Sequence, residues 1–362
     1  MVFFPRREKK AKHFTPFQSG LSTPRCYSES GGRILPVRDF LRFAAHVQLL
    51  PVLESGEETL IGGQAVMEGV MMRAPHSYCV AVRKPNGEVV TEEKPLAKVS
   101  ETYPIFRFPL LRGLGTLGQA MSLGFKALQF SANAALEDEA AQKQATKQKP
   151  FSNWMMGIQL AFSLAFFIFA YKLVPLWLTT EIGKAVPEVQ GRVAFNLTDG
   201  LIRIAIFLAF LWGISRWRDI HRVFEYHGAE HRVVFNYESG KPVTVENAQR
   251  FVTWHPRCGT SFLITVMLIS MAIYTVLPFD SFAAKFASRV VLLPLIAGIS
   301  YEVIRFAARR RGSMLALLTA PGLWLQRITT QTPADDQTEI AIIALDGAMK
   351  LEREQGGQLV IA

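Results

Sequence analysis

FSNWMMGIQLAFSLAFFIFAY, residues 151–171, decides the fold class, because it runs for 21 residues without a charged side chain. GTSFLITVMLISMAIYTVLPF, residues 259–279, repeats this pattern later in the chain. A helix of about 20 apolar residues crosses the roughly 30 Å hydrocarbon core of a bilayer with every backbone group bonded internally. A buried helix of a soluble protein seldom stays uncharged for so long. Both stretches therefore predict transmembrane helices.

Two weaker apolar runs predict further transmembrane helices. Val193–Ser215 contains Asp199 and Arg203, which lie four residues apart on one helix face and can pair there. Val290–Ile304 is long enough to span only if Glu302 lies at the membrane edge. The sequence thus predicts a mainly α, polytopic membrane protein with about four transmembrane helices.

Two further segments predict helices that lie in the membrane interface. Ser313–Gln326 is too short to span comfortably and contains Pro321-Gly322, which is typical of an interfacial or re-entrant helix. Phe108–Leu136 is a long helix candidate with Lys126 in its middle, and a lysine at the bilayer centre is costly. An interfacial helix is the favoured reading, and a span or re-entrant hairpin is the alternative.

The formal charge of +10 is distributed around the predicted spans. Basic residues follow or precede them at Lys143, Lys147, Lys149, Arg216, Arg218, Arg222, Arg305, Arg309, Arg310 and Arg311. The loops 180–199 and 279–289 carry fewer, so the positive-inside rule places both termini and residues 216–258 in the cytoplasm. We expect a multi-pass protein of the cytoplasmic membrane that contacts anionic lipid headgroups, and no nucleic-acid partner.

The predicted organisation has five parts: an irregular basic segment (1–58), a cytoplasmic strand and turn segment (59–107), an interfacial helix and linker (108–150), a membrane domain (151–326) with a cytoplasmic insert (216–258), and a cytoplasmic C-terminal helix (327–362). Ser77–Arg83 followed by Pro85-Asn86-Gly87 predicts a β-hairpin in the second part. The N-terminus lacks the apolar core of a signal peptide, and an organellar transit peptide stays open. Three scattered cysteines imply no disulfide framework.

His227-Gly228-Ala229-Glu230-His231 is the sharpest chemical feature. On a helix, positions i, i+3 and i+4 share one face, so both imidazoles and the carboxylate converge. Two neutral imidazoles suit a divalent metal, with zinc expected, and Glu230 can accept a proton as general base. The order is the H-x-x-E-H of the inverted zincins. The alternative is a surface helix whose histidines meet lipid or carboxylates.

A metal site needs further ligands, and three residues at the same predicted membrane face are candidates. His255 and Cys258 offer an imidazole and a thiol just before the third predicted span, and Glu302 lies at the end of the fourth. Each has another explanation: Cys258 can be a small buried apolar residue, and Glu302 can pair with Arg305. The sequence leaves the choice open.

GGQAVMEGVMMR, residues 62–73, is predicted to be a structured loop. Glycines allow close backbone approach to a ligand, and Gln64, Glu68 and Arg73 offer polar groups that would orient a substrate. A packing turn without a ligand is the alternative.

Six motifs, GGQAVMEGVMMR, EYHGAEHRVVFNYE, TVENAQRF, HPRCGTSFL, LPLIAGISYE and PGLWLQRITT, together resemble the YqhQ-like family of bacterial membrane proteins. The resemblance covers about residues 60–350. It implies a multi-span cytoplasmic-membrane protein of a domain-of-unknown-function family, described as predicted metal-dependent enzymes. No substrate follows from it. The leading hypothesis is a zinc-dependent membrane enzyme, with hydrolysis as the expected reaction; the alternative is a non-enzymatic transporter or an assembly or scaffold factor.

Overall fold

The computed structural model describes residues 61–142, 153–255, 258–309 and 320–354, so the predicted irregular segment 1–58 lies outside the described residues. All described residues belong to the same compact unit. In chain order the elements are β1 (Gly62–Val66), β2 (Gly69–Arg73), β3 (Ser77–Arg83), β4 (Val89–Pro95), α2 (Val99–Thr102), η1 (Pro104–Arg107), α3 (Leu111–Gln142), α4 (Asn153–Ile168), η2 (Phe169–Leu173), α5 (Val174–Ala185), η3 (Pro187–Gln190), α6 (Arg192–Ile214), α7 (Arg218–Glu238), α8 (Val245–Gln249), α9 (Gly259–Val276), α10 (Phe282–Val291), α11 (Leu293–Arg309), α12 (Ala320–Thr329) and α13 (Asp335–Glu354).

The four strands form one antiparallel sheet in the order β1-β2-β3-β4. The segment predicted as a loop, residues 62–73, is instead a hairpin: β1 and β2 pair from Gly62 opposite Arg73 to Val66 opposite Gly69. The prediction missed it because β2 is buried on both faces, so its residues show no alternation of apolar and polar types. The hairpin predicted at β3 and β4 is confirmed, with Gly87 at a φ of +88° in its turn.

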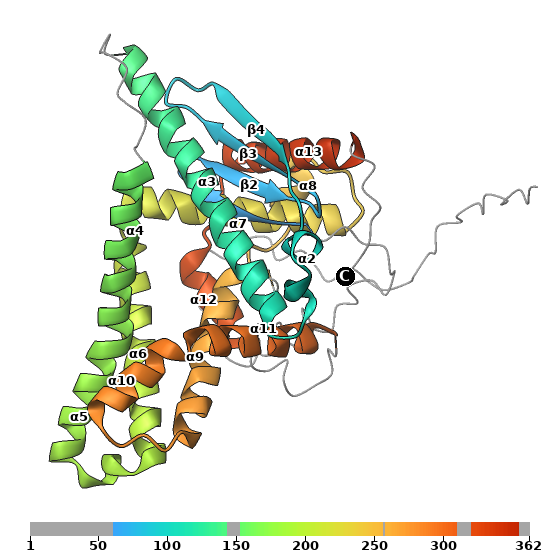
Figure 1. The fold of residues 1–362 in the computed structure, drawn as a ribbon. Helices are drawn as coiled ribbons and strands as arrows, with labels where there is room; N and C mark the ends of the chain where they lie inside the picture. Colours follow the sequence, from blue (N-terminus) through green and yellow to red (C-terminus); the bar gives the residue numbers. More distant parts are fainter. Residues whose placement is uncertain (1–60, 143–152, 256–257, 310–319, 355–362) are drawn as a thin grey trace, which may run out of the picture. The chain divides into compact units, whose positions relative to one another are not determined.

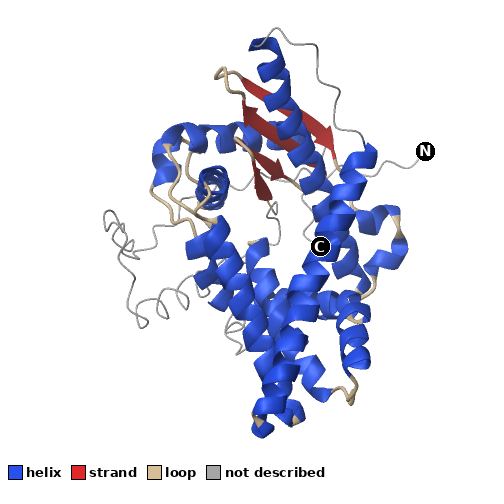
Figure 2. Ribbon diagram, turned by 90° about the vertical axis from the view of Figure 1, so that its left-hand side faces the viewer, coloured by secondary structure: helices blue, strands red, loops and turns tan. Residues whose placement is uncertain are grey.

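Helices cover both faces of the sheet (Figure 1). One face packs on α3, where Val66, Met71 and Val80 meet Leu123 and Ala127. The other face packs on α7 and α13, in a core that includes Met72, Ala81, Tyr226, Val233 and Ile340. Figure 2 shows the red strands with helices on either side. The predicted C-terminal helix is confirmed as α13, and it is part of this core.

In the part of the chain that the structure describes, three helices are long and apolar enough to cross a membrane, or four if one bent pair counts as a single span. They are Gly157–Ala185, Arg192–Ile214 and Gly259–Val276, in agreement with three of the predicted runs. Only 22 to 28% of the residues in their apolar windows are buried, so most of their apolar side chains face outward. A soluble protein rarely exposes apolar surface on this scale.

The fourth predicted span is not one straight helix. α10 and α11 meet at an angle of 52°, and the break falls beside Pro294. Proline lacks the N–H that would bond to the carbonyl four residues earlier, and its ring clashes with that carbonyl. The pair forms either a broken span or a re-entrant loop.

The predicted helix at Phe108–Leu136 is present as α3, which packs on the sheet and is not one of the three described helices that are long and apolar enough to cross a membrane. Its placement in a membrane interface stays a prediction. Within the predicted short helix Ser313–Gln326, the described part begins at Ala320 and continues to Thr329 as α12.

Buried charges join the apolar helices. Asp199 on α6 accepts hydrogen bonds from Arg203 at 2.5 Å and lies 3.2 Å from Arg289 of α10, and all three side chains are almost fully buried. The predicted Asp199–Arg203 pair is therefore present, with a second arginine added. Lys172, in the π-helical turn η2, is also buried and interacts electrostatically with these three residues. Ionisable groups placed this way in apolar helices are commonly functional.

Candidate metal centre

α7 places the two histidines of the HGAEH motif on the same side of one helix. Asp219 in the first turn favours the helix N-terminus, and Tyr226, Ala229 and Val233 bury one face against the sheet and α13. Because four residues make slightly more than one helical turn, His227 and His231 lie one above the other. Their ring centroids are 4.5 Å apart.

Each of the two imidazoles is fixed by a backbone carbonyl. Nδ1 of His227 is 2.8 Å from the carbonyl oxygen of Thr329, and Nδ1 of His231 bonds to that of Thr253. A carbonyl oxygen only accepts, so Nδ1 carries the proton in both rings and Nε2 keeps a free lone pair. Histidines that bind metals are commonly held this way.

Cys258 brings a thiol to the two Nε2 atoms from the N-cap position of α9. Its sulfur lies 3.2 Å from Nε2 of His227 and 3.1 Å from the hydroxyl oxygen of Thr260. Burial raises the pKa of the thiol, but the His231 imidazole and the Thr260 hydrogen bonds outweigh it, so that the pKa is lowered. The N-terminus of α9 also favours a thiolate.

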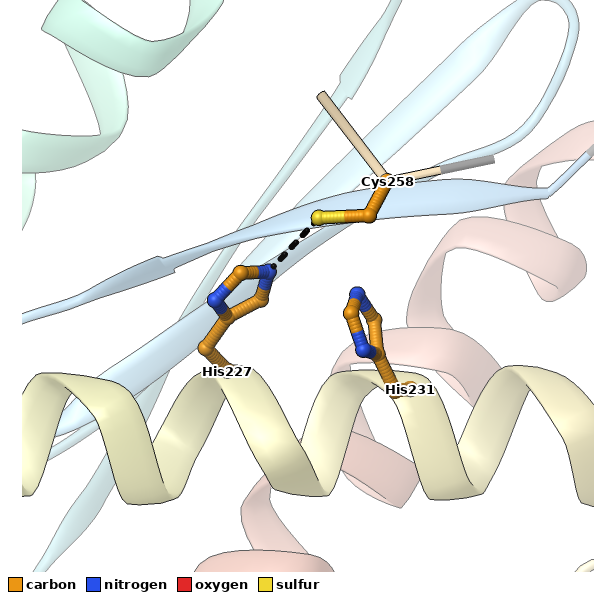
Figure 3. A group of neighbouring side chains, drawn as sticks. All are labelled: His227, His231 and Cys258. Carbon is orange, nitrogen blue, oxygen red and sulfur yellow. Dashed lines mark hydrogen bonds between the residues drawn. The ribbon is translucent and has the colours of Figure 1, made fainter. Parts of the chain in front are cut away.

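One ligand atom from each of His227, His231 and Cys258 lies within 4.8 Å of the other two. Figure 3 shows both imidazoles rising from α7 toward the sulfur. In a tetrahedral zinc site, Zn–N bonds of about 2.0–2.1 Å and Zn–S bonds of about 2.3 Å separate a nitrogen and a sulfur ligand by about 3.6 Å. The three side chains therefore fit a zinc ion with small adjustments, and burial lowers the pKa of His231, which keeps that ligand neutral.

Glu230 lies beside this group and beneath β1. The backbone N–H of Gly63 donates to its carboxylate, and its Oε2 has no hydrogen-bond partner among the described residues. Burial raises the pKa of Glu230 to about 7. A Cβ at Gly63 would lie 3.0 Å from Cγ of Glu230, so the close approach of strand and helix requires a glycine here.

These residues line a pocket of about 360 Å³, a volume typical of small ligand sites. Residues 61–65 form one wall, and Val223, Phe224 and Val234 add apolar surface from α7. The polar side chains are those of Gln64, His227, Glu230, His231, His255, Cys258 and Thr260. The arrangement combines metal-ligand atoms, a buried carboxylate and a space for a substrate.

The family described as "Protein of unknown function (DUF1385)" matches residues 108–351, which is more than half of the chain. The chain belongs to the DUF1385 family. The "Uncharacterized protein YqhQ" of Bacillus subtilis (strain 168) is 34% identical over 297 residues, which cover 80% of this chain and 92% of that protein. The resemblance to the YqhQ-like family is thus confirmed. No solved structure matches the chain.

Two of the metal ligands predicted for this DUF1385 protein are not brought into the group. His255 lines the pocket, but its Nε2 faces Glu238 at 3.6 Å, and burial lowers its pKa to about 4. Glu302 accepts hydrogen bonds from Arg112 and from the backbone N–H of Leu110. The alternative explanation of Glu302 named Arg305 as its partner, whereas the structure pairs it with Arg112 of α3.

The residues predicted to bind substrate lie in different places. Gln64 lines the pocket, and its side chain donates to the carbonyl of Ala120. Glu68, whose backbone has a φ of +52°, accepts two hydrogen bonds of 2.5 Å from Arg222 of α7. Arg73 ends β2 and is not among the residues that line the pocket. Glu68 therefore fixes α7 to the β1–β2 turn, and Gln64 alone of the three reaches the site.

Sequence reasoning missed the groups that fix the metal-binding side chains. The carbonyls of Thr253 and Thr329 leave no signal, because every residue has one. Gln326 could have been noticed in the sequence as a single amide side chain in an apolar run. Its side chain is fully buried. It accepts a hydrogen bond from the backbone N–H of His255 at 2.7 Å and donates one to the carbonyl of His255 at 2.8 Å. It thereby fixes the segment before Cys258 to α12.

We predict that Gly228→Ala weakens both the fold and metal binding in this DUF1385 protein. A Cβ at Gly228 would collide with the backbone carbonyl oxygen of Gln331, in the segment that follows Thr329. Overpacking of this kind costs about 1–3 kcal/mol and would move α7 away from that segment. Gly118→Ala is the matched control, because its Cβ meets nothing within 4 Å and alanine favours a helix. The thermal midpoint and the zinc content report the effect; equal values for the two variants would contradict it.

Proposed function

We propose that this DUF1385 protein is a membrane-bound, zinc-dependent hydrolase whose metal ligands are His227, His231 and Cys258. The observation that carries the proposal is the geometry of the two histidines. Both are fixed through Nδ1 by backbone carbonyls, and both direct Nε2 toward one thiol. Three protein ligands with a fourth position open is the usual arrangement of a catalytic zinc site.

The residues around the pocket would have different roles in hydrolysis. A bound zinc ion would supply a Lewis acid and lower the pKa of a water molecule in its open position. Glu230 would act as the general base for an attacking water, through the carboxylate oxygen that has no partner among the described residues. Gly63 holds the other oxygen in place, and the apolar wall around the pocket limits access of bulk water. Proton transfer of this kind contributes about 10²–10⁴-fold to a rate.

The site would lie at the cytoplasmic surface of the membrane. Cys258 caps α9, one of the three apolar helices, so the metal centre would sit at the end of a span. Basic residues flank the apolar helices on the side that carries residues 216–258, which supports cytoplasmic placement and contact with anionic headgroups.

A transporter is the second candidate, and the buried charges favour it. Asp199, Arg203 and Arg289 lie between apolar helices, as expected of residues along a transport pathway. The two candidates depend on different residues, because the metal centre contains none of these three.

Metal analysis of the wild-type protein tests the hydrolase. We expect about one zinc per chain in protein purified in detergent without a chelator, because three ligands bind with their lone pairs already directed. The thermal midpoint should fall after dialysis against a chelator and recover with added zinc, since a ligand that binds only the folded state stabilises it. Protein that contains no metal and gains none from added zinc would exclude the hydrolase and leave the transporter.

A further inference from the structure

The edge of the sheet reaches the candidate metal centre. Among the described residues, β1 has a neighbouring strand on one side only, because the strand order begins with it. Residues 61–65, five in succession, line the pocket that also contains His227, Glu230 and Cys258. A strand face would present every second residue, whereas consecutive residues indicate that the pocket meets the strand along its backbone edge.

The register shows which backbone groups face that edge. Val66 and Gly69 flank a two-residue turn and form a pair, and such a pair is hydrogen-bonded. Hydrogen-bonded and non-hydrogen-bonded pairs alternate along the two strands. Gly63 and Ala65 therefore belong to non-hydrogen-bonded pairs, and their backbone N–H and C=O groups point away from β2. The hydrogen bond from Gly63 N–H to Glu230 agrees with this register.

The remaining edge groups are the carbonyl of Gly63 and both groups of Ala65. No hydrogen-bond partner is found for them within the described part of the chain. A row of unpaired donors and acceptors is a template for an additional strand. Here the template lines the same pocket as His227, His231 and Cys258, rather than lying on a distant surface.

We propose that the substrate is an extended peptide, which pairs with β1 as a fifth strand and presents one amide carbonyl to the metal centre. This inference rests on the proposed function, since it assigns a substrate class to the same site. The reaction is hydrolysis: the water oxygen bonds to the carbonyl carbon and the amide C–N bond breaks. Glu230 passes the proton of the water to the leaving nitrogen, so a carboxylate and an amine are formed without a further reactant.

The pocket wall defines which peptide side chains fit. Val223, Phe224 and Val234 provide apolar surface next to the strand, and a Cβ at Gly62 would meet nothing within 4 Å, which leaves room for a large side chain. None of the described lining residues is a lysine or arginine. A phosphate group would therefore find no cationic side chain here, whereas an apolar peptide finds both backbone partners and apolar contacts.

Peptide pairing can be measured with zinc-binding probes on the full-length protein in detergent. The probes are a leucine tripeptide hydroxamate and acetohydroxamate, which share the zinc-binding group and differ in the peptide. We expect the tripeptide to bind about 100-fold tighter, since it adds backbone hydrogen bonds and apolar contacts. N-methylation of single peptide nitrogens should weaken binding about tenfold at alternate positions and little in between, because only every second residue pairs with a strand.

Ala65→Pro provides the matching change in the protein. Proline removes an N–H from the free edge, at a position where the β1–β2 pairing does not use it. We expect unchanged zinc content and acetohydroxamate affinity, and about tenfold weaker tripeptide binding. If this variant does not fold, the N-methyl series on the wild-type protein gives the same answer.

The outcomes separate the two proposals. Zinc-loaded protein that binds both hydroxamates equally, or that shows N-methyl effects without alternation, overturns the peptide inference and leaves the zinc centre standing. Wild-type protein that holds no zinc overturns both.

Discussion

Purified His227→Ala and His231→Ala proteins are expected to contain almost no zinc. Each substitution removes one of three protein ligands, whose atoms lie within 4.8 Å of one another. Loss of an outer hydrogen-bond partner alone lowers metal affinity by about 10–100-fold, so loss of a direct ligand should lower it by more than about 100-fold. Metal analysis of protein purified without a chelator measures the result. Wild-type zinc content in both variants would refute the assigned ligands.

His221→Ala is the matched control for these two variants. His221 lies on the same helix, but its side chain is 47% exposed and faces Glu225. It should keep its zinc. Cys258→Ser tests the third ligand: loss of zinc would assign the thiolate, and retention would require another ligand in its place. Glu302 could serve only if it left Arg112, so His255, which already lines the pocket, would be examined first.

Glu230→Gln is expected to keep zinc and to lose function. Glutamine has the shape of glutamate and still accepts the Gly63 hydrogen bond, but it cannot take up a proton. We expect a rate lower by about 10²–10⁴-fold, the usual contribution of a general base. Zinc content and complementation of a deletion phenotype are the two measurements, and hydrolysis of a leucine peptide can replace the second.

Glu246→Gln controls for the change of charge. Glu246 is exposed at the start of α8 and pairs with Arg250, so its loss should affect neither zinc nor function. Full complementation by Glu230→Gln with zinc still bound would mean that the metal is structural and that the hydrolase mechanism is wrong.

Local patterns in the sequence predicted several of the features that depend on neighbouring residues. Uncharged runs predicted the apolar helices, because a helix that crosses a membrane must be apolar along about 20 residues. The Asn86-Gly87 turn predicted its hairpin, since glycine adopts a positive φ without strain. The spacing of His227 and His231 predicted that both imidazoles share one helix face. The break beside Pro294 in the fourth predicted span was not predicted.

Tertiary structure decided the features that join distant segments. Cys258 meets His227 across 31 residues, and no local rule chooses it over His255 or Glu302. The hairpin of β1 and β2 was hidden because the buried strand β2 lacks alternation, so its free edge beside the metal centre could not be foreseen. Glu68 pairs with Arg222 at a separation of 154 residues and therefore fixes a helix rather than a substrate. The sequence by itself determined which helices form and which side chains share a helix face, since both follow from hydrogen bonds and side-chain directions within a few residues. Only packing between segments decided which groups complete the site, because the contacts that hold Cys258, Glu230 and β1 together arise from burial of the whole core.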